Sequence, residues 1–133
     1  MTIVVGFTPT AAGRAALLAA AEEATRRQMP VVVVNSSRGD ALSDPGFAQP
    51  ADLDWVRSTL TDAGVSFTVR QEVRGREASE EVLDVLNESN ARLCVIGIRQ
   101  RSAVGKMLLG SNAFRILMGA PCPVLAIKAH ADG

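Results

Sequence analysis

Short apolar runs alternate with longer segments of helical character along this 133-residue chain. Four of the runs contain no charged residue and are rich in branched aliphatic residues, which is typical of strands buried on both faces of a parallel sheet. A fifth run alternates apolar and polar residues, the pattern of a half-exposed strand. In chain order the predicted strands are Ile3–Phe7, Val31–Val34, Val65–Val73, Leu93–Ile98 and Val124–Ile127.

The segments between these strands carry the start and stop signals of helices. Thr10 precedes a stretch rich in alanine and leucine that runs to about Arg27, and its hydroxyl is suited to cap that helix. The second helix is predicted from apolar residues at helical spacing, with Gly64 as its stop. The third follows Gly75. The fourth begins at Ser111 or Asn112, either of which is suited to cap it.

Strict alternation of strands and helices requires a parallel sheet with right-handed crossovers. The sequence therefore predicts a single α/β domain over residues 1–133, an open, doubly wound, Rossmann-like sheet with helices on both faces. The continuously apolar first, second and fourth runs should be central and the alternating third run should be an edge, which the strand order 3-2-1-4-5 satisfies. In that order the topology reverses between the first and fourth strands, where open α/β sheets bind ligands.

Composition excludes several classes of protein. The 14 basic and 14 acidic residues give a formal net charge of zero, which argues against nucleic acid as a main partner. No apolar run approaches the roughly 20 residues of a membrane span, and the N-terminus lacks the pattern of a signal peptide. Two cysteines and one histidine are too few for a disulfide framework or a zinc site. We expect a cytoplasmic protein without a membrane or nucleic-acid partner.

The segment from Gly97 to Asn112 is the predicted ligand site. A strand, a glycine-bearing basic loop and the start of a helix make an anion site, because free backbone N–H groups and the helix dipole point outward. Gly97 would permit close approach of backbone or base, and Gly110 would permit a sharp entry into the helix. The alternative is that both glycines serve tight turns and that the basic residues Arg99, Arg101 and Lys106 form a solvated loop.

Two better-known phosphate motifs are missing. Gly105-Lys106 looks like the end of a Walker A loop, but Gln100 stands at the required glycine and Met107 at the hydroxyl residue. No G-x-G-x-x-G follows the first strand.

The segment Gly97-x2-Gln100-x9-Gly110-Ser111, followed by a helix and then Ala-Pro-Cys-Pro-Val-Leu-Ala-Ile, closely resembles the nucleotide-binding signature of the universal stress proteins, G-x2-G-x9-G-[S/T]. The resemblance also covers the opening residues Ile3 to Thr10 and the spacing of the elements between. Two positions depart from the pattern: Gln100 replaces the second glycine, and Thr8 replaces the acidic residue that often ends the first strand.

The resemblance implies a stress-response or signalling protein that binds ATP or another adenine nucleotide, alone or with Mg²⁺, at the switch point. Asn35, at the end of the second strand, would meet the base or ribose. The residues expected to bind the nucleotide are Gly6, Phe7, Thr8, Asn35, Gly97, Ile98, Arg99, Gln100, Arg101, Gly110, Ser111, Asn112 and Ala113. No catalytic base or metal ligand is predicted, so slow ATP hydrolysis or autophosphorylation is the most that the resemblance implies. A dimeric interaction protein that binds no nucleotide is the alternative.

The fifth strand is an apolar edge, which is prone to pair with another chain. The expected partner is a second copy of the chain, joined through Val124, Leu125, Ala126 and Ile127, as the resemblance also implies. The long segment from Arg38 to Pro50 has no periodicity and is either a binding loop or a disordered excursion.

Overall fold

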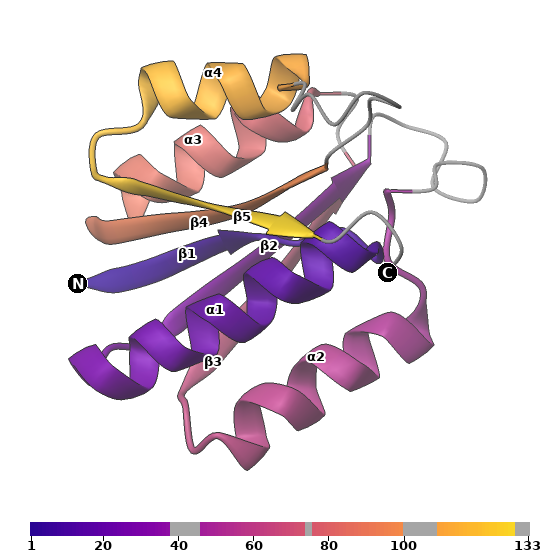
Figure 1. Ribbon diagram of the computed structural model, residues 1–133, viewed down its shortest axis with the longest axis vertical. Helices are drawn as coiled ribbons and strands as arrows, with labels where there is room; N and C mark the ends of the chain where they lie inside the picture. The colour runs from indigo at the N-terminus through magenta and orange to yellow at the C-terminus, as the bar shows by residue number, and fades with distance from the viewer. Residues whose placement is uncertain (38–45, 74–75, 100–108, 130–133) are drawn as a thin grey trace.

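The computed structural model describes residues 1–37, 46–73, 76–99 and 109–129. Strands and helices alternate along the chain, as predicted (Figure 1). The elements are β1 (Thr2–Gly6), α1 (Ala11–Arg27), β2 (Val31–Ser37), α2 (Pro50–Asp62), β3 (Phe67–Val73), α3 (Ala78–Glu88), β4 (Ala91–Arg99), α4 (Ser111–Gly119) and β5 (Val124–Ala129).

The five strands form one parallel sheet in the order β3-β2-β1-β4-β5. The predicted fold class, strand number and strand order are therefore confirmed. The register places Gly6 of β1 beside Val34 of β2 on one side and Ile96 of β4 on the other. The carboxyl ends of these neighbouring strands consequently meet at one edge of the sheet, where the topology reverses.

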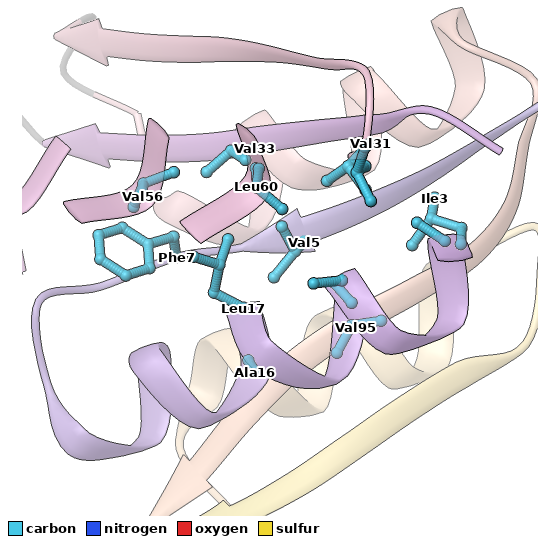
Figure 2. Packing of buried hydrophobic residues seen from close by; sticks show 14 of the residues in the cluster. Ile3, Val5, Phe7, Ala16, Leu17, Val31, Val33, Val56, Leu60 and Val95 are labelled. Atoms are coloured by element: carbon cyan, nitrogen blue, oxygen red, sulfur yellow. The ribbon is translucent and has the colours of Figure 1, made fainter. Parts of the chain in front are cut away.

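Helices cover both faces of the sheet. Helices α1 and α2 lie against one face, and α3 and α4 lie against the other (Figure 1). The first core includes Ile3, Val5, Leu17, Val56 and Leu60, and Figure 2 shows these side chains between β1, α1 and α2. Small alanines on the buried side of α1, such as Ala16 and Ala20, let that helix lie close to the sheet. Within the described residues, no helix is long and apolar enough to span a membrane.

The ends of several elements have a physical explanation. Thr10 caps α1 as expected, since its side chain accepts a hydrogen bond from the Gly13 N–H. Helix α2 begins at Pro50, before the apolar spacing starts, because proline suits the first turn and the Asp52 carboxylate accepts from the Gln49 N–H. Gly64 ends that region with a φ of +73°, a conformation that glycine adopts readily.

Strand β3 starts at Phe67, two residues later than predicted, because the Val65 N–H is bonded to the Leu60 carbonyl of the preceding helix. Strand β2 continues past its apolar run to Ser37 and pairs with β3 over that extension. The first part of the Arg38–Pro50 segment, residues 38–45, lies outside the described residues, so its role as a binding loop stays a prediction.

Candidate functional site

A cavity of about 340 Å³ opens at the switch point, beyond the carboxyl ends of β1 and β4. Six of the residues predicted from the sequence line it: Gly6, Phe7, Thr8, Gly97, Asn112 and Ala113. They come from the end of β1, the end of β4 and the first turn of α4. Part of the predicted set therefore lies at one cavity, to which it contributes from three separate parts of the chain.

Sequence reasoning missed one whole wall of this cavity. Arg76 and Glu77, just before α3, line it together with Ala78 and Val82 of that helix. Apolar residues of β2, β4 and α4 also line it, namely Val34, Ile96 and Ile116. Ser36 and Gly46 complete the lining beside β2. The available signal was topological, since α3 begins at the same edge of the sheet as the other loops.

The first turn of α4 presents free backbone donors beside the cavity. The first hydrogen bond of the helix joins the Phe114 N–H to the Gly110 carbonyl. Within the described part of the chain nothing accepts from the N–H groups of Ser111, Asn112 and Ala113. Such groups and the helix dipole together favour an anion.

The cap expected on α4 is absent, which corrects the prediction. The N-cap residue is Gly110, and no side chain of the described residues caps the helix. The Asn112 Oδ1 instead accepts a hydrogen bond of 3.1 Å from the Ser79 N–H, in the first turn of α3. Asn112 therefore caps the neighbouring helix and leaves its own uncapped.

The backbone of Gly110 also differs from expectation. Its φ of −70° and ψ of 165° are extended and open to any residue. A β-carbon on Gly110 would have no atom of the described residues within 4 Å. The helix entry therefore does not require glycine.

Thr8 lies two residues beyond the end of β1, and its hydroxyl is hydrogen-bonded to that of Thr10. The Thr8 and Thr10 hydroxyl oxygens are 2.9 Å apart, and Thr10 also accepts from the Gly13 N–H at 3.1 Å. A hydroxyl can both donate and accept, so Thr8 retains hydrogen-bonding capacity toward the cavity.

Asn35 does not have the role expected of it. Its side chain is 1% exposed and makes four hydrogen bonds to its own chain. The amide nitrogen donates to the carbonyls of Phe7 (2.9 Å) and Gly46 (2.8 Å), and the oxygen accepts from the Ala48 N–H (2.9 Å) and the Gln71 amide (3.0 Å). These bonds use every donor and lone pair of a primary amide, so none remains for a base or ribose.

Two other predicted residues belong to the cores. The Phe7 side chain is buried in the core toward α2 (Figure 2). Its ring stacks on that of Trp55, with the ring centroids 6.3 Å apart. The Ile98 side chain is buried in the core beneath α3 and α4 and does not line the cavity. Ile98 therefore belongs to the core and not to the lining, whereas Phe7 contributes to the core and also lines the cavity.

Arg76 stands at the cavity wall within a cluster of acidic side chains. Its guanidinium contacts the carboxylates of Glu80 (3.7 Å), Glu81 (3.5 Å) and Asp84 (2.7 Å). The hydrogen bond to Asp84 is the main cause of a raised pKa for Arg76. A charge already shared among several carboxylates is a weak partner for an added anion, so the start of α4 is the better candidate for one.

The remaining predicted residues cannot be placed in the cavity. Gln100, Arg101 and Lys106 lie outside the described residues, and for Arg99 the backbone alone is described. Gly110 and Ser111 are exposed at the start of α4, next to the lining residue Asn112. Among the described residues, no group of three or more His, Cys, Asp or Glu side chains is arranged to hold a metal ion.

The model of the universal stress protein family matches residues 1–128 of this chain. The chain belongs to that family. A universal stress protein of Mycolicibacterium smegmatis is 47% identical to it over 128 residues, which are 96% of this chain and 98% of the relative.

Solved universal stress proteins have the same fold. One from Archaeoglobus fulgidus is 34% identical, with a TM-score of 0.81 over 96% of this chain and 98% of that one. Another from the same organism, solved in complex with dAMP, is 29% identical, with a TM-score of 0.71 and the same coverage of both chains. That second protein is therefore both a relative in sequence and a nucleotide complex.

Proposed function

We propose that this universal stress protein binds an adenine nucleotide in the switch-point cavity and acts in stress response or signalling. One observation carries the proposal: the cavity ends at a helix N-terminus whose first three N–H groups have no acceptor among the described residues. Phosphate oxygens are suited to those groups. The complex of the Archaeoglobus relative with dAMP supports the same ligand class.

The walls of the cavity suit the rest of a nucleotide. Val82, Ile96 and Ile116 give an apolar interior in which the flat face of a purine would be removed from water. Thr8, Ser36 and Asn112 place polar groups at the same cavity, where they can meet ribose or phosphate. A volume of about 340 Å³ falls near the small end of ligand sites, and this favours a mononucleotide over a larger ligand.

ATP, alone or with Mg²⁺, remains part of the proposal. Its longer phosphate chain carries more negative charge, and the sequence holds basic residues such as Arg101 and Lys106 shortly before α4. Thr8 carries no charge, so its contact with ribose would be a single hydrogen bond, weaker than that of a carboxylate.

We further propose that the protein is a cytoplasmic homodimer joined through β5. This strand is at the edge of the sheet and pairs with β4 alone among the described strands. Its apolar residues Val124, Leu125, Ala126 and Ile127 are only partly buried, as expected for an edge that a second copy covers. Sedimentation equilibrium at micromolar to tens-of-micromolar concentration tests this, and a purely monomeric profile would overturn it.

Two measurements test nucleotide binding. Freshly purified protein is denatured, and released small molecules are identified by mass spectrometry. The emptied protein is then titrated calorimetrically with AMP, dAMP, cyclic AMP and ATP, each with and without Mg²⁺. We expect saturable binding of at least one of them.

A cavity-filling variant localises the site. Ala113→Leu adds a larger side chain to the lining of the cavity, so binding should fall by about tenfold or more. Ser58→Leu introduces the same side chain at an exposed position of α2, on the other face of the sheet, and should bind as the wild type does.

Absence of binding in every titration would favour the alternative of an interaction protein without nucleotide. Equal binding by Ala113→Leu and wild type would move the site elsewhere.

A further inference from the structure

The side chain of Asn112 joins the first turns of the two helices that wall the cavity. Asn112 is the second residue of α4, and Ser79 is the second residue of α3. The Ser79 N–H, which has no partner within its own helix, donates to the Asn112 Oδ1 at 3.1 Å. This bond links residues 33 positions apart and fixes which end of the amide faces α3.

That bond determines what Asn112 offers to the cavity. A primary amide has an acceptor oxygen on one branch and a donor nitrogen on the other. The oxygen is committed to α3, and Asn112 is a lining residue. No acceptor for the Asn112 Nδ2 exists among the described residues, so the nitrogen remains available as a donor.

We infer that Asn112 is a specificity-determining residue, whose Nδ2 donates to the anionic group of the ligand and so selects phosphorylated over unphosphorylated nucleosides. The inference rests on the proposed function and concerns the polarity of the same site. The Nδ2 group adds a side-chain donor to the backbone donors of Ser111, Asn112 and Ala113, at the end of the cavity that the dipole of α4 makes positive.

The substitution Asn112→Asp separates the two roles of Asn112, which are to accept from the Ser79 N–H and to donate to the ligand. Its carboxylate would still accept from the Ser79 N–H, and the dipoles of both helices favour a negative charge there. The fold therefore has no need of an amide rather than a carboxylate. Binding of a phosphorylated ligand does require the amide, because a carboxylate has no donor and repels phosphate.

The experiment compares AMP with adenosine as probes of wild-type protein and of Asn112→Asp. AMP affinity should fall by about tenfold or more in the variant, since a charge of the same sign is placed beside the phosphate. Adenosine affinity should change by less than about threefold, because adenosine has no phosphate to repel. The unfolding midpoint in urea should not fall.

Two controls keep the result specific. Phe114→Asp adds the same charge two residues further along α4, on a side chain that is 55% exposed and does not line the cavity, and should retain AMP binding. In the wild type, the side-chain amide signal of Asn112 should shift in nuclear magnetic resonance spectra on addition of AMP, and much less on addition of adenosine.

The outcomes separate the inference from the proposed function. Selective loss of AMP by Asn112→Asp, together with the shift of the amide signal, supports the inference. Equal loss of AMP and adenosine, no loss of AMP, or the same loss in Phe114→Asp would overturn the inference while nucleotide binding stands. A wild type that binds neither AMP nor any other adenine nucleotide would overturn both.

Discussion

A β-carbon placed on Gly97 would lie 2.2 Å from the backbone oxygen of Ala12. This glycine of β4 therefore lets the first turn of α1 pack directly on the sheet, next to the cavity that Gly97 also lines. The position was predicted from the sequence as a point of close approach. The structure shows that the approaching group is the protein's own backbone.

Gly97→Ala should destabilise the fold strongly. The clash involves a main-chain atom that has no freedom to rotate away, so we expect the free energy of unfolding to fall by about 3 kcal/mol or more. Urea denaturation measures this. Gly6→Ala is the matched control, because its β-carbon would meet Val82 and Ile96 at 3.5 and 3.7 Å, and it should stay within about 1 kcal/mol of the wild type. Equal stability of both variants would contradict the packing role of Gly97.

Gly110→Asp should change stability and binding in opposite directions. At this N-cap position a carboxylate would accept from the N–H groups of α4 and complement the helix dipole, so stability should rise by about 0.3–1 kcal/mol. The same carboxylate would occupy the donors proposed for phosphate, so AMP affinity should fall by about tenfold or more. Urea denaturation and calorimetric titration give the two values. The control Gly110→Ala lacks an acceptor and should bind AMP nearly as the wild type does; undiminished binding by Gly110→Asp would remove α4 from the site.

Asn35→Asp should destabilise the protein by about 3 kcal/mol or more. The carboxylate would lose both donors and face the carbonyls of Phe7 and Gly46 in a buried position. Gln71→Ala, which removes one partner of Asn35, should cost only about 1 kcal/mol. Thermal and urea unfolding measure both effects. Normal stability of Asn35→Asp with loss of nucleotide binding would instead return Asn35 to the ligand site.

Ser79→Ala should leave stability unchanged or raise it by up to about 1 kcal/mol. Ser79 is 0% exposed, and its hydroxyl has no hydrogen-bond partner among the described residues, so removing it removes an uncompensated polar group. Ser89→Ala is the contrast, because the Ser89 hydroxyl donates to the Val85 carbonyl at 2.6 Å. That variant should lose about 1 kcal/mol in the same urea titration. A comparable loss in Ser79→Ala would show that its hydroxyl has a partner.

The buried Cys94 thiol should make the protein less stable in alkali. Burial, with a smaller contribution from Cys122, raises the pKa of Cys94 to about 12 from an ordinary value of 9.0. Between these values the unfolded chain releases a proton that the folded chain keeps, so the free energy of unfolding falls as pH rises from about 9 to 12. The limiting slope for one such group is about 1.4 kcal/mol per pH unit.

The comparison that isolates this effect is the slope of unfolding free energy against pH in wild type and in Cys94→Ala. Urea titrations between about pH 8 and 10.5, which cover the beginning of the expected change, should give a steeper decline for the wild type. Parallel slopes would mean that Cys94 ionises equally in both states. Comparing slopes rather than absolute stabilities removes the cost of the smaller side chain.

Local sequence patterns determined the element order and the sheet order, and they indicated where a ligand cavity should open. Apolar periodicity, the Thr10 cap and the Gly64 stop are properties of short stretches of chain, so they could be recognised without coordinates. The continuous apolar runs of β1, β2 and β4 indicated central strands, because burial on both faces excludes polar residues. The switch point then followed from the strand order alone.

Tertiary structure alone decided which polar groups are free to meet a ligand. The Asn35 amide is fully bonded, in part to Gln71, 36 residues away, and the Asn112 oxygen accepts from Ser79, 33 residues away. The start of α3 becomes a wall of the cavity. A side chain's type states how many hydrogen bonds it can make, but its partners depend on where distant segments come to lie. The availability of a polar group for a ligand is therefore a property of the packed chain, whereas the pattern of strands and helices can be predicted from the local sequence.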